Sequence, residues 1–194
     1  MINERLEYMR DNYEILGGVK IMAPAPNIGH NVTLVSLASI IEYHMLKNDI
    51  TGYVCTDNID VHLPDGTLFK PDLTVILPKN KDIINWGGAI HGVPDMVVEV
   101  LSKSTKHRDR TLKKDIYEAN GVKEYWITDP FMKCVEVYIL TDGKFELTGE
   151  YQHYTPYEIE RLTDEEKKDV KYEVPVSILP GLSVDLNYIF RWGS

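Results

Sequence analysis

Residues 94–129 constrain the fold more than any other part of the chain, because they read as a strand, a helix and a second strand in succession. Residues 95–101 are rich in valine and bounded by Pro94 and Ser102, which is typical of a strand inside a covered sheet. Residues 124–128 read as the second strand. A helix that joins two strands over so short a distance indicates a right-handed parallel crossover.

Glu99 interrupts the first of these strands with a charge. Side chains alternate along a strand, so Glu99 shares one face with Val97 and Leu101. The other face carries Met96, Val98 and Val100. An ionised carboxylate in a buried strand costs free energy unless a cation meets it. We therefore expect a cationic partner for Glu99 on the following helix.

That helix is predicted to begin at Thr105, which can cap it, and to end at Asn120, just before Gly121. Its predicted apolar stripe consists of Leu112, Ile116 and Ala119. Four side chains line up beside the stripe at helical spacing: Lys106, Arg110, Lys113 and Tyr117. Lys113 is therefore expected at the border of the buried face, where a lysine can bury its stem and reach round the sheet.

The charge of the chain bears on any nucleic-acid hypothesis. The net charge is -9, whereas phosphate binding needs local positive potential. Basic residues nevertheless cluster in one stretch that contains a single acid, Asp109: Lys103, Lys106, Arg108, Arg110, Lys113 and Lys114. A globally acidic protein can still carry a basic cleft.

Length and cysteine content predict the class of protein. With 194 residues and 43% hydrophobic content, the chain is expected to form one domain over residues 1–194. Cys55 and Cys134 lie far apart without metal-ligand spacing, which fits a reducing compartment. The first residues do not read as a signal peptide, and no apolar run is long enough to span a bilayer. We expect a cytoplasmic protein.

The remaining segments predict a mixed α/β architecture. Residues 31–47 have the apolar spacing of a core-packed helix, and residues 135–147 alternate around Asp142-Gly143 as a β-hairpin does. Further strands are predicted over 13–22, 53–63, 71–77 and 174–178, a loop or short helical turn over 78–93, exposed structure over 151–171, and a short helix over 186–190. The predicted fold class is α/β, a mixed sheet with a helix on each side.

Asp72 and Glu99 are the candidate site acids, because each lies in an otherwise apolar strand. Two carboxylates beside a lysine such as Lys113 form a constellation suited to metal-assisted phosphodiester hydrolysis. The acids bind Mg²⁺, the metal polarises the phosphate and lowers the pKa of a bound water, and the lysine positions the nucleophile or neutralises developing charge. Asp95 competes for the first role, but four residues of strand separate it from Glu99 by about 13 Å.

Each of these side chains also has a structural interpretation. Asp72 and Glu99 could be ion-paired to Lys113 or Arg110 at the ends of the sheet. His30 could contact a substrate or could stabilise the start of a helix. Tyr117 and Trp126 fit a core better than a base-stacking platform, and the basic run fits a solvated helix face.

Several motifs together resemble one protein family. They are Pro71-Asp72, residues 92–105, Arg108-Asp109, Lys113, Tyr117 and residues 121–130, and the likeness extends over nearly the whole chain, including residues 23–26 with His30, Asp60-Val61, the hairpin and residues 178–182. The sequence resembles the Uma-two family of restriction endonucleases, within the PD-(D/E)XK nuclease superfamily. The resemblance implies a restriction-endonuclease-like mixed sheet flanked by helices with an added β-hairpin, and a Mg (or Mn) dependent attack on DNA phosphodiesters.

Carried onto this chain, the resemblance makes Asp72 and Glu99 the metal-binding acids, with Val100 in the same metal set. The superfamily lysine normally follows the glutamate by two residues, where this chain has Leu101. The family pattern moves that lysine to the helix, which indicates Lys113 with Lys114 as the second choice. The expected substrate contacts are His30, Lys106, Arg110, Lys114 and Tyr117.

The sequence leaves open a further metal ligand, the oligomeric state and the alternative function. Glu14 or Glu42 could add a further metal ligand, because residues 17–19 depart from the family pattern after the first glutamate. The fold class also suggests a homodimer, in which two sites address two strands. The alternative function is a catalytically silent DNA-binding or structural dimer of the same fold.

Overall fold

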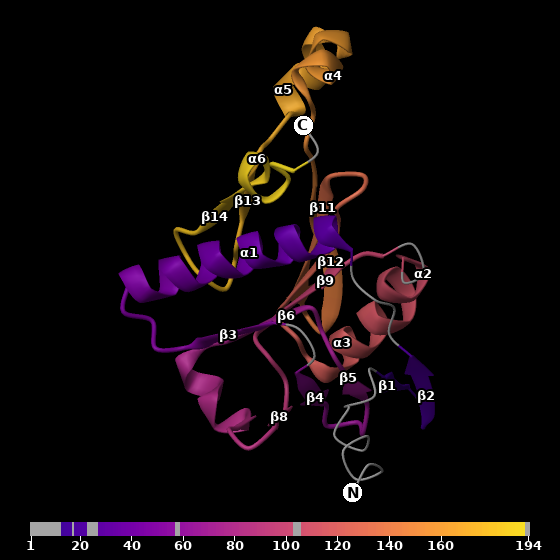
Figure 1. Cartoon of the computed structure of the whole chain (residues 1–194), viewed down its shortest axis with the longest axis vertical. Helices are drawn as coiled ribbons and strands as arrows, with labels where there is room; N and C mark the ends of the chain where they lie inside the picture. The colour runs from indigo at the N-terminus through magenta and orange to yellow at the C-terminus, as the bar shows by residue number, and fades with distance from the viewer. Residues whose placement is uncertain (1–12, 17, 23–26, 57–58, 103–105, 193–194) are drawn as a thin grey trace, which may run out of the picture.

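The computed structural model describes residues 13–16, 18–22, 27–56, 59–102 and 106–192. A six-stranded mixed sheet lies at its centre, in the order β12-β11-β10-β9-β6-β3 (Figure 1). Its strands are β3 (Tyr53–Thr56), β6 (Leu73–Ile76), β9 (Met96–Val100), β10 (Glu124–Asp129), β11 (Cys134–Thr141) and β12 (Lys144–Gln152). Strands β9 and β10 are parallel and β11 and β12 form an antiparallel hairpin, so the predicted parallel crossover and added hairpin are confirmed.

A second sheet packs beside the first, in the order β2-β1-β5-β4-β8-β7. Its strands are β1 (Tyr13–Leu16), β2 (Val19–Met22), β4 (Asp60–His62), β5 (Leu68–Phe69), β7 (Ile84–Asn85) and β8 (Ala89–His91), and a 3₁₀ helix, η1 (Pro78–Ile83), precedes β7. The single strand predicted over 53–63 is wrong, because β3 pairs with β6 in the central sheet whereas β4 pairs with β5 and β8 in the second. In the sequence, apolar and polar residues alternate loosely over 53–63, so the pattern could not reveal a change of sheet.

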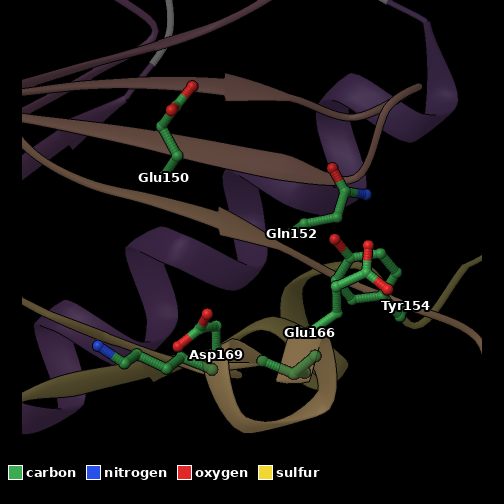
Figure 2. Close-up of a pocket in the computed structure, with 7 residues that line it drawn as sticks. Glu150, Gln152, Tyr154, Glu166 and Asp169 are labelled. Carbon is green, nitrogen blue, oxygen red and sulfur yellow. The ribbon is translucent and has the colours of Figure 1, made fainter. Parts of the chain in front are cut away.

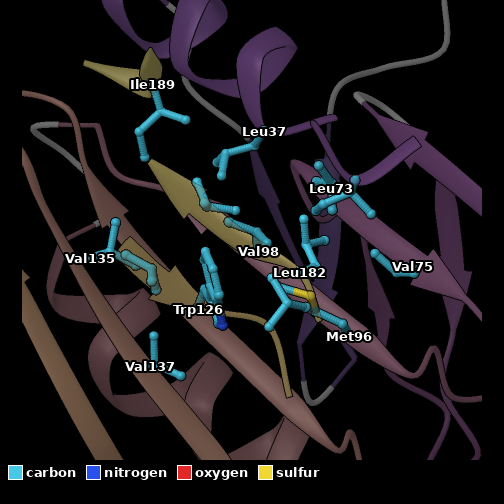
Figure 3. Packing of buried hydrophobic residues seen from close by; sticks show 14 of the residues in the cluster. Leu37, Leu73, Val75, Met96, Val98, Trp126, Val135, Val137, Leu182 and Ile189 are labelled. Carbon is cyan, nitrogen blue, oxygen red and sulfur yellow. The ribbon is translucent and has the colours of Figure 1, made fainter. Parts of the chain in front are cut away.

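Helix α1 (Ile28–Lys47) covers one face of the central sheet (Figure 1). It begins where the Asn27 side chain accepts a hydrogen bond from the His30 backbone N–H. The hairpin of β13 (Glu173–Pro175) and β14 (Ser183–Asp185), followed by α6 (Leu186–Ile189), closes the same layer. Leu37 and Ile189 point toward Val98 and Trp126 of the sheet in this core (Figure 3). The short helices α4 (Pro156–Arg161) and α5 (Asp164–Asp169) lie at one end of the molecule and bury none of their side chains.

Strand β9 contributes to a separate core on each face of the sheet. Met96, Val98 and Val100 belong to the cluster under α1. Val97 and Leu101 belong to the cluster under the second sheet and the crossover helix. This division confirms the predicted alternation, and burial on both faces explains why the strand is an almost unbroken apolar run.

The crossover helix consists of α2 (Lys106–Arg108), a π-helical turn η2 (Asp109–Lys113) and α3 (Lys114–Asn120), and it ends at Gly121 with φ of 85°. Thr105 lies outside the described residues. The predicted apolar stripe is wrong, because Leu112 and Ala119 are exposed. The buried side chains are instead Asp109, Lys113 and Tyr117, which lie four residues apart on one face. Glu99 of the sheet faces this side of the helix. Cationic and hydroxyl side chains therefore lower the free energy more than an aliphatic side chain would, because they can pair with the buried carboxylate.

Within the described ranges, no helix is long and apolar enough to cross a membrane.

Candidate active site

An acidic row crosses the central sheet on the face that the crossover helix covers. Glu99 of β9 pairs with Ile127 of β10, and Ile127 pairs with Glu136 of β11. Leu73 pairs with Val98, so the adjoining residues bring Asp72 opposite Glu99. Directly opposed residues share a face of the sheet, and their Cβ atoms lie about 5 Å apart. The two sequence-predicted acids therefore lie side by side.

The crossover helix places a cation and a hydroxyl group on Glu99. Lys113 Nζ donates a hydrogen bond to Glu99 Oε1 at 2.9 Å, and Tyr117 Oη donates to the same oxygen at 2.9 Å. All three side chains are buried. Both hydrogen bonds that the described residues make to Glu99 therefore use Oε1.

Glu14 of β1 completes the surroundings of Lys113. Lys113 Nζ lies 2.7 Å from Glu14 Oε1 and 3.8 Å from Asp109 Oδ1. Glu14 Oε1 also accepts a hydrogen bond from the Lys70 backbone N–H at 3.3 Å, and Glu14 Oε2 lies 2.9 Å from Arg108 Nη2. The amino-terminal hairpin is thus tied to the crossover helix through one buried carboxylate.

Asp72 connects the row to helix α1. Its Oδ2 accepts a hydrogen bond of 2.7 Å from the Val100 backbone N–H, and its Oδ1 lies 3.3 Å from His30 Nε2. Val100 has an apolar side chain that is buried in the core under α1, so only its backbone carbonyl could coordinate a metal. His30 is buried where α1 begins, and the Asn27 cap holds its backbone.

Carboxylates are concentrated around Lys113. Among the described residues, Glu99, Glu14 and Asp109 lie within 4 Å of Lys113 Nζ, Glu14 also contacts Arg108, and Asp72 contacts His30. Glu99, Glu14 and Asp109 are buried. Buried carboxylates that lie close together favour the uptake of a proton or of a cation.

The pKa values of Glu99 and Lys113 follow from burial and from the neighbouring charges. Burial raises the pKa of Glu99 well above its ordinary value, Lys113 acts against the rise, and Asp109, Asp72 and Glu14 add to it. Burial would lower the pKa of Lys113, but Glu99, Glu14 and Asp109 together outweigh it and raise that pKa. Burial also raises the pKa of Tyr117 well above its ordinary value, so its hydroxyl keeps the proton that it donates to Glu99.

The donor set around Glu99 and Asp72 suits a metal that needs few protein ligands. In the part of the chain that the structure describes, no three or more His, Cys, Asp or Glu side chains form a metal-holding group. Mg²⁺ is commonly held by one or two carboxylates and completes its shell with water and substrate phosphate. The two carboxylates of Asp72 and Glu99 fit that requirement, whereas a metal that takes all of its ligands from the protein would need more donors than the described residues bring together.

Other predicted contact residues lie toward β10 and β11 instead. Lys106 Nζ lies 2.6 Å from Asp129 Oδ2, and Arg110 Nη2 lies 2.5 Å from Glu136 Oε1. The Lys114 ammonium lies 5.3 Å from the centre of the Tyr138 ring. The basic run is therefore largely paired with acids, and it does not form one continuous positive surface over its described residues.

The sequence left open whether Glu14 belongs to the candidate site, and it did not assign Arg108 or Asp109 to it. The structure brings Glu14 into the group but leaves Glu42 exposed on α1. Glu14 resembles Glu99 in the sequence, since it too interrupts an apolar strand of the pattern Tyr-Glu-Ile-Leu. That signal could have identified it, whereas Arg108 could be placed only by knowing which strand approaches the helix.

A separate hollow lies between β12 and α5 (Figure 2). It has a volume of about 260 Å³ and is lined in part by the carboxylates of Glu150, Glu166 and Asp169. Glu166 also caps its own helix through Thr163. Acidic walls repel phosphate groups, so this hollow is a poor candidate for contact with a nucleic-acid backbone.

Comparison with known proteins agrees with the sequence resemblance. A crystal structure of a "putative nuclease belonging to DUF820" from Anabaena variabilis matches with a TM-score of 0.70 at 19% identity, covering 98% of this chain and 97% of that one. The likeness shows a shared fold, and the predicted restriction-endonuclease-like α/β class is confirmed. The type IIG restriction endonuclease BpuSI matches at a TM-score of 0.38 and 14% identity, over 67% of this chain and 14% of its own. No curated protein matches the sequence significantly.

A family model described as "Uma2: Putative restriction endonuclease" matches residues 3–173, which is well over half of the sequence. The chain therefore belongs to the Uma2 (Uma-two) family.

Proposed function

We propose that the protein is a metal-dependent endonuclease that hydrolyses DNA phosphodiester bonds, with Asp72, Glu99 and Lys113 at its active site. The observation that carries the proposal is the strand register that sets Asp72 opposite Glu99, with the Lys113 ammonium 2.9 Å from Glu99 Oε1. Membership of a restriction-endonuclease family supports DNA as the substrate.

Asp72 and Glu99 would hold Mg²⁺, or Mn²⁺ in its place, with the Val100 carbonyl as the third ligand. The bound ion would polarise the scissile phosphate and lower the pKa of the attacking water. The buried carboxylates gathered around Lys113 favour such an ion. Val100 and His30 each hold one oxygen of Asp72, so this carboxylate is oriented by the backbone of β9 and by helix α1.

Lys113 would act as a fixed positive charge rather than as a base. Its raised pKa keeps the amine protonated at neutral pH. An ammonium group has three donors, and two are directed at Glu99 and Glu14. Asp109 at 3.8 Å is too distant for a hydrogen bond, so the described residues supply no third acceptor, and the third donor would serve the attacking water or the phosphate. Tyr117 would orient Glu99 without touching the substrate.

A catalytically silent DNA-binding or structural dimer is the second candidate. It is favoured by the pairing of Lys113, Arg108, Lys106 and Arg110 with buried or half-buried acids. Lys106 and Arg110 would have to leave Asp129 and Glu136 before they could contact a DNA phosphate. The two candidates differ in one respect, since only the enzyme needs a divalent ion at Asp72 and Glu99.

The test is cleavage of supercoiled plasmid, single-stranded DNA and branched DNA with Mg²⁺, with Mn²⁺ and with chelator. Asp72→Asn and Glu99→Gln keep the size of each side chain and should abolish cutting, and Lys113→Ala should do the same. Glu160→Gln changes an exposed acid on α4 and should cut as the wild type does. A lack of cutting on every substrate, together with no Mg²⁺-dependent rise in melting temperature, would favour the silent dimer.

A further inference from the structure

Helix α1 presents an exposed ridge beside the core that it covers. The ridge consists of Ile28, Val35, Ser39 and Leu46, and its three apolar members are 83%, 56% and 68% exposed in chain order. At 3.6 residues per turn these four positions fall within about 40° of one another around the helix axis. Large aliphatic side chains aligned in this way on a helix favour burial against another surface.

The spacing of the ridge is the same read in either direction. Ile28 and Leu46 lie nine residues to either side of position 37, and Val35 and Ser39 lie two residues to either side. An antiparallel pair of identical helices, related by a two-fold axis beside position 37, therefore sets Ile28 against Leu46 of the second copy, and Val35 against its Ser39. An interface between identical chains needs such self-complementarity, whereas a surface for an unrelated partner does not.

A groove of about 450 Å³ runs beside the ridge, between α1 and β3. Its lining combines aliphatic and small polar side chains: Asn31, Leu34, Val35, Ala38, Ser39, Glu42, Val54 and Thr56. Strand β3 is the outermost strand on this side of the central sheet. Edge strands are commonly protected by a covering element. Side chains from the opposing helix could fill the groove and cover this edge.

We infer that the α1 ridge and the adjoining groove bind a second copy of this chain in an antiparallel, two-fold arrangement. Asn31 and Tyr43 lie six residues to either side of position 37 and project about 60° to opposite sides of the ridge, so they would flank the paired helices. His30 lies seven residues from the axis, which places the two His30 positions about 21 Å apart along the helices. This dimer does not depend on catalytic activity. It assigns the homodimer expected from the fold class to a defined surface on α1.

The first test is the oligomeric state, measured by light scattering and sedimentation at about 100 μM protein. The wild type should have the mass of two chains, and Leu46→Glu should halve it, because the charge would be buried against Ile28. Leu147→Glu is the matched control, since Leu147 is an exposed leucine on β12, away from α1. A monomeric wild type, or a dimer that survives Leu46→Glu, would overturn the inference.

The second test checks the pairing itself. Positions 28 and 46 are about 27 Å apart within one helix, too far for a disulfide inside one chain. Oxidised Ile28→Cys/Leu46→Cys protein should therefore run as a covalent dimer, with much less crosslinking in either single variant. A dimer that forms in solution but does not crosslink in the double variant would refute the antiparallel register. Plasmid cutting is measured in parallel, so that loss of the dimer and lack of nuclease activity are distinguished.

Discussion

At the scale of single residues, the unusual feature is a buried lysine shared by carboxylates from different parts of the chain. Lys113 contacts Glu14 and Glu99, which belong to different sheets. A buried ion group contributes little net stability when complete, because desolvation offsets the attraction between its charges. Removal of one member is costly, because uncompensated charges of one sign then remain buried.

Lys113→Met should lower the free energy of unfolding by about 3–5 kcal/mol at pH 8 and by less at pH 5.5. Lys113 holds down the pKa of Glu99, so without it the pKa of Glu99 rises further above the unfolded value, and stability is lost as the pH rises through it. Urea denaturation at the two pH values measures this difference. Lys144→Met is the control, since the exposed Lys144 pairs with Glu118 at the surface and its loss should change stability little. An equal loss at both pH values would contradict this account.

The raised pKa of Glu99 predicts a pH-dependent response to Mg²⁺. The folded protein retains the Glu99 proton above the unfolded pKa, so the stability from this group is present at low pH and is lost as the pH rises through the folded pKa. A bound cation offsets that loss. The Mg²⁺-dependent rise in melting temperature should therefore be larger at pH 8.5 than at pH 5.5, and it should vanish in Glu99→Gln. If Mg²⁺ raised the melting temperature equally at both pH values, metal binding would not depend on the protonation state of Glu99.

At the scale of elements, the ends of the helices determine where the site residues lie. The cap of α1 fixes the turn that carries His30 to Asp72, and Gly121 ends the crossover helix where β10 must begin. The sequence indicated the end at Gly121, because glycine adopts a positive φ without steric cost. It did not indicate the π-helical turn at Asp109–Lys113, which has no distinctive residue pattern.

Asn27→Ala should destabilise the protein by about 1 kcal/mol, because the His30 backbone N–H loses its acceptor. Asn27→Ser keeps a capping oxygen and should cost much less. Thermal unfolding compares the two variants, and the nuclease assay reports whether the change reaches Asp72 through His30. Equal stability of the two variants would show that the cap contributes nothing measurable.

At the scale of the whole molecule, the central sheet separates two hydrophobic cores. The cluster under α1 and the cluster under the second sheet each take alternate residues of β9. The candidate site lies at the margin between them, where Asp72 meets α1 on one side and Glu99 meets the crossover helix on the other. The contact of Asp72 with α1 and the contact of Glu99 with the crossover helix hold the two acids in place.

Substitutions in the two cores should act independently. Ile41→Val in the first cluster and Ile90→Val in the second should each cost about 0.5–1.5 kcal/mol, because each removes one buried methylene group. The double variant should lose the sum of the two costs to within about 0.5 kcal/mol. Urea denaturation of all three variants measures the coupling. A coupling energy of about 1 kcal/mol or more would indicate that the sheet transmits packing changes between its faces.

The sequence by itself determined the parallel crossover, the two faces of β9, the hairpin and the pair Asp72 and Glu99, because these depend on local periodicity and on charges inside apolar runs. Only the tertiary structure decided that Lys113 is buried rather than at a border, that Glu14 joins it, and that residues 53–63 divide between two sheets. The physical reason is that local patterns record which residues prefer burial. The partners that make a buried charge tolerable come from strands distant in sequence.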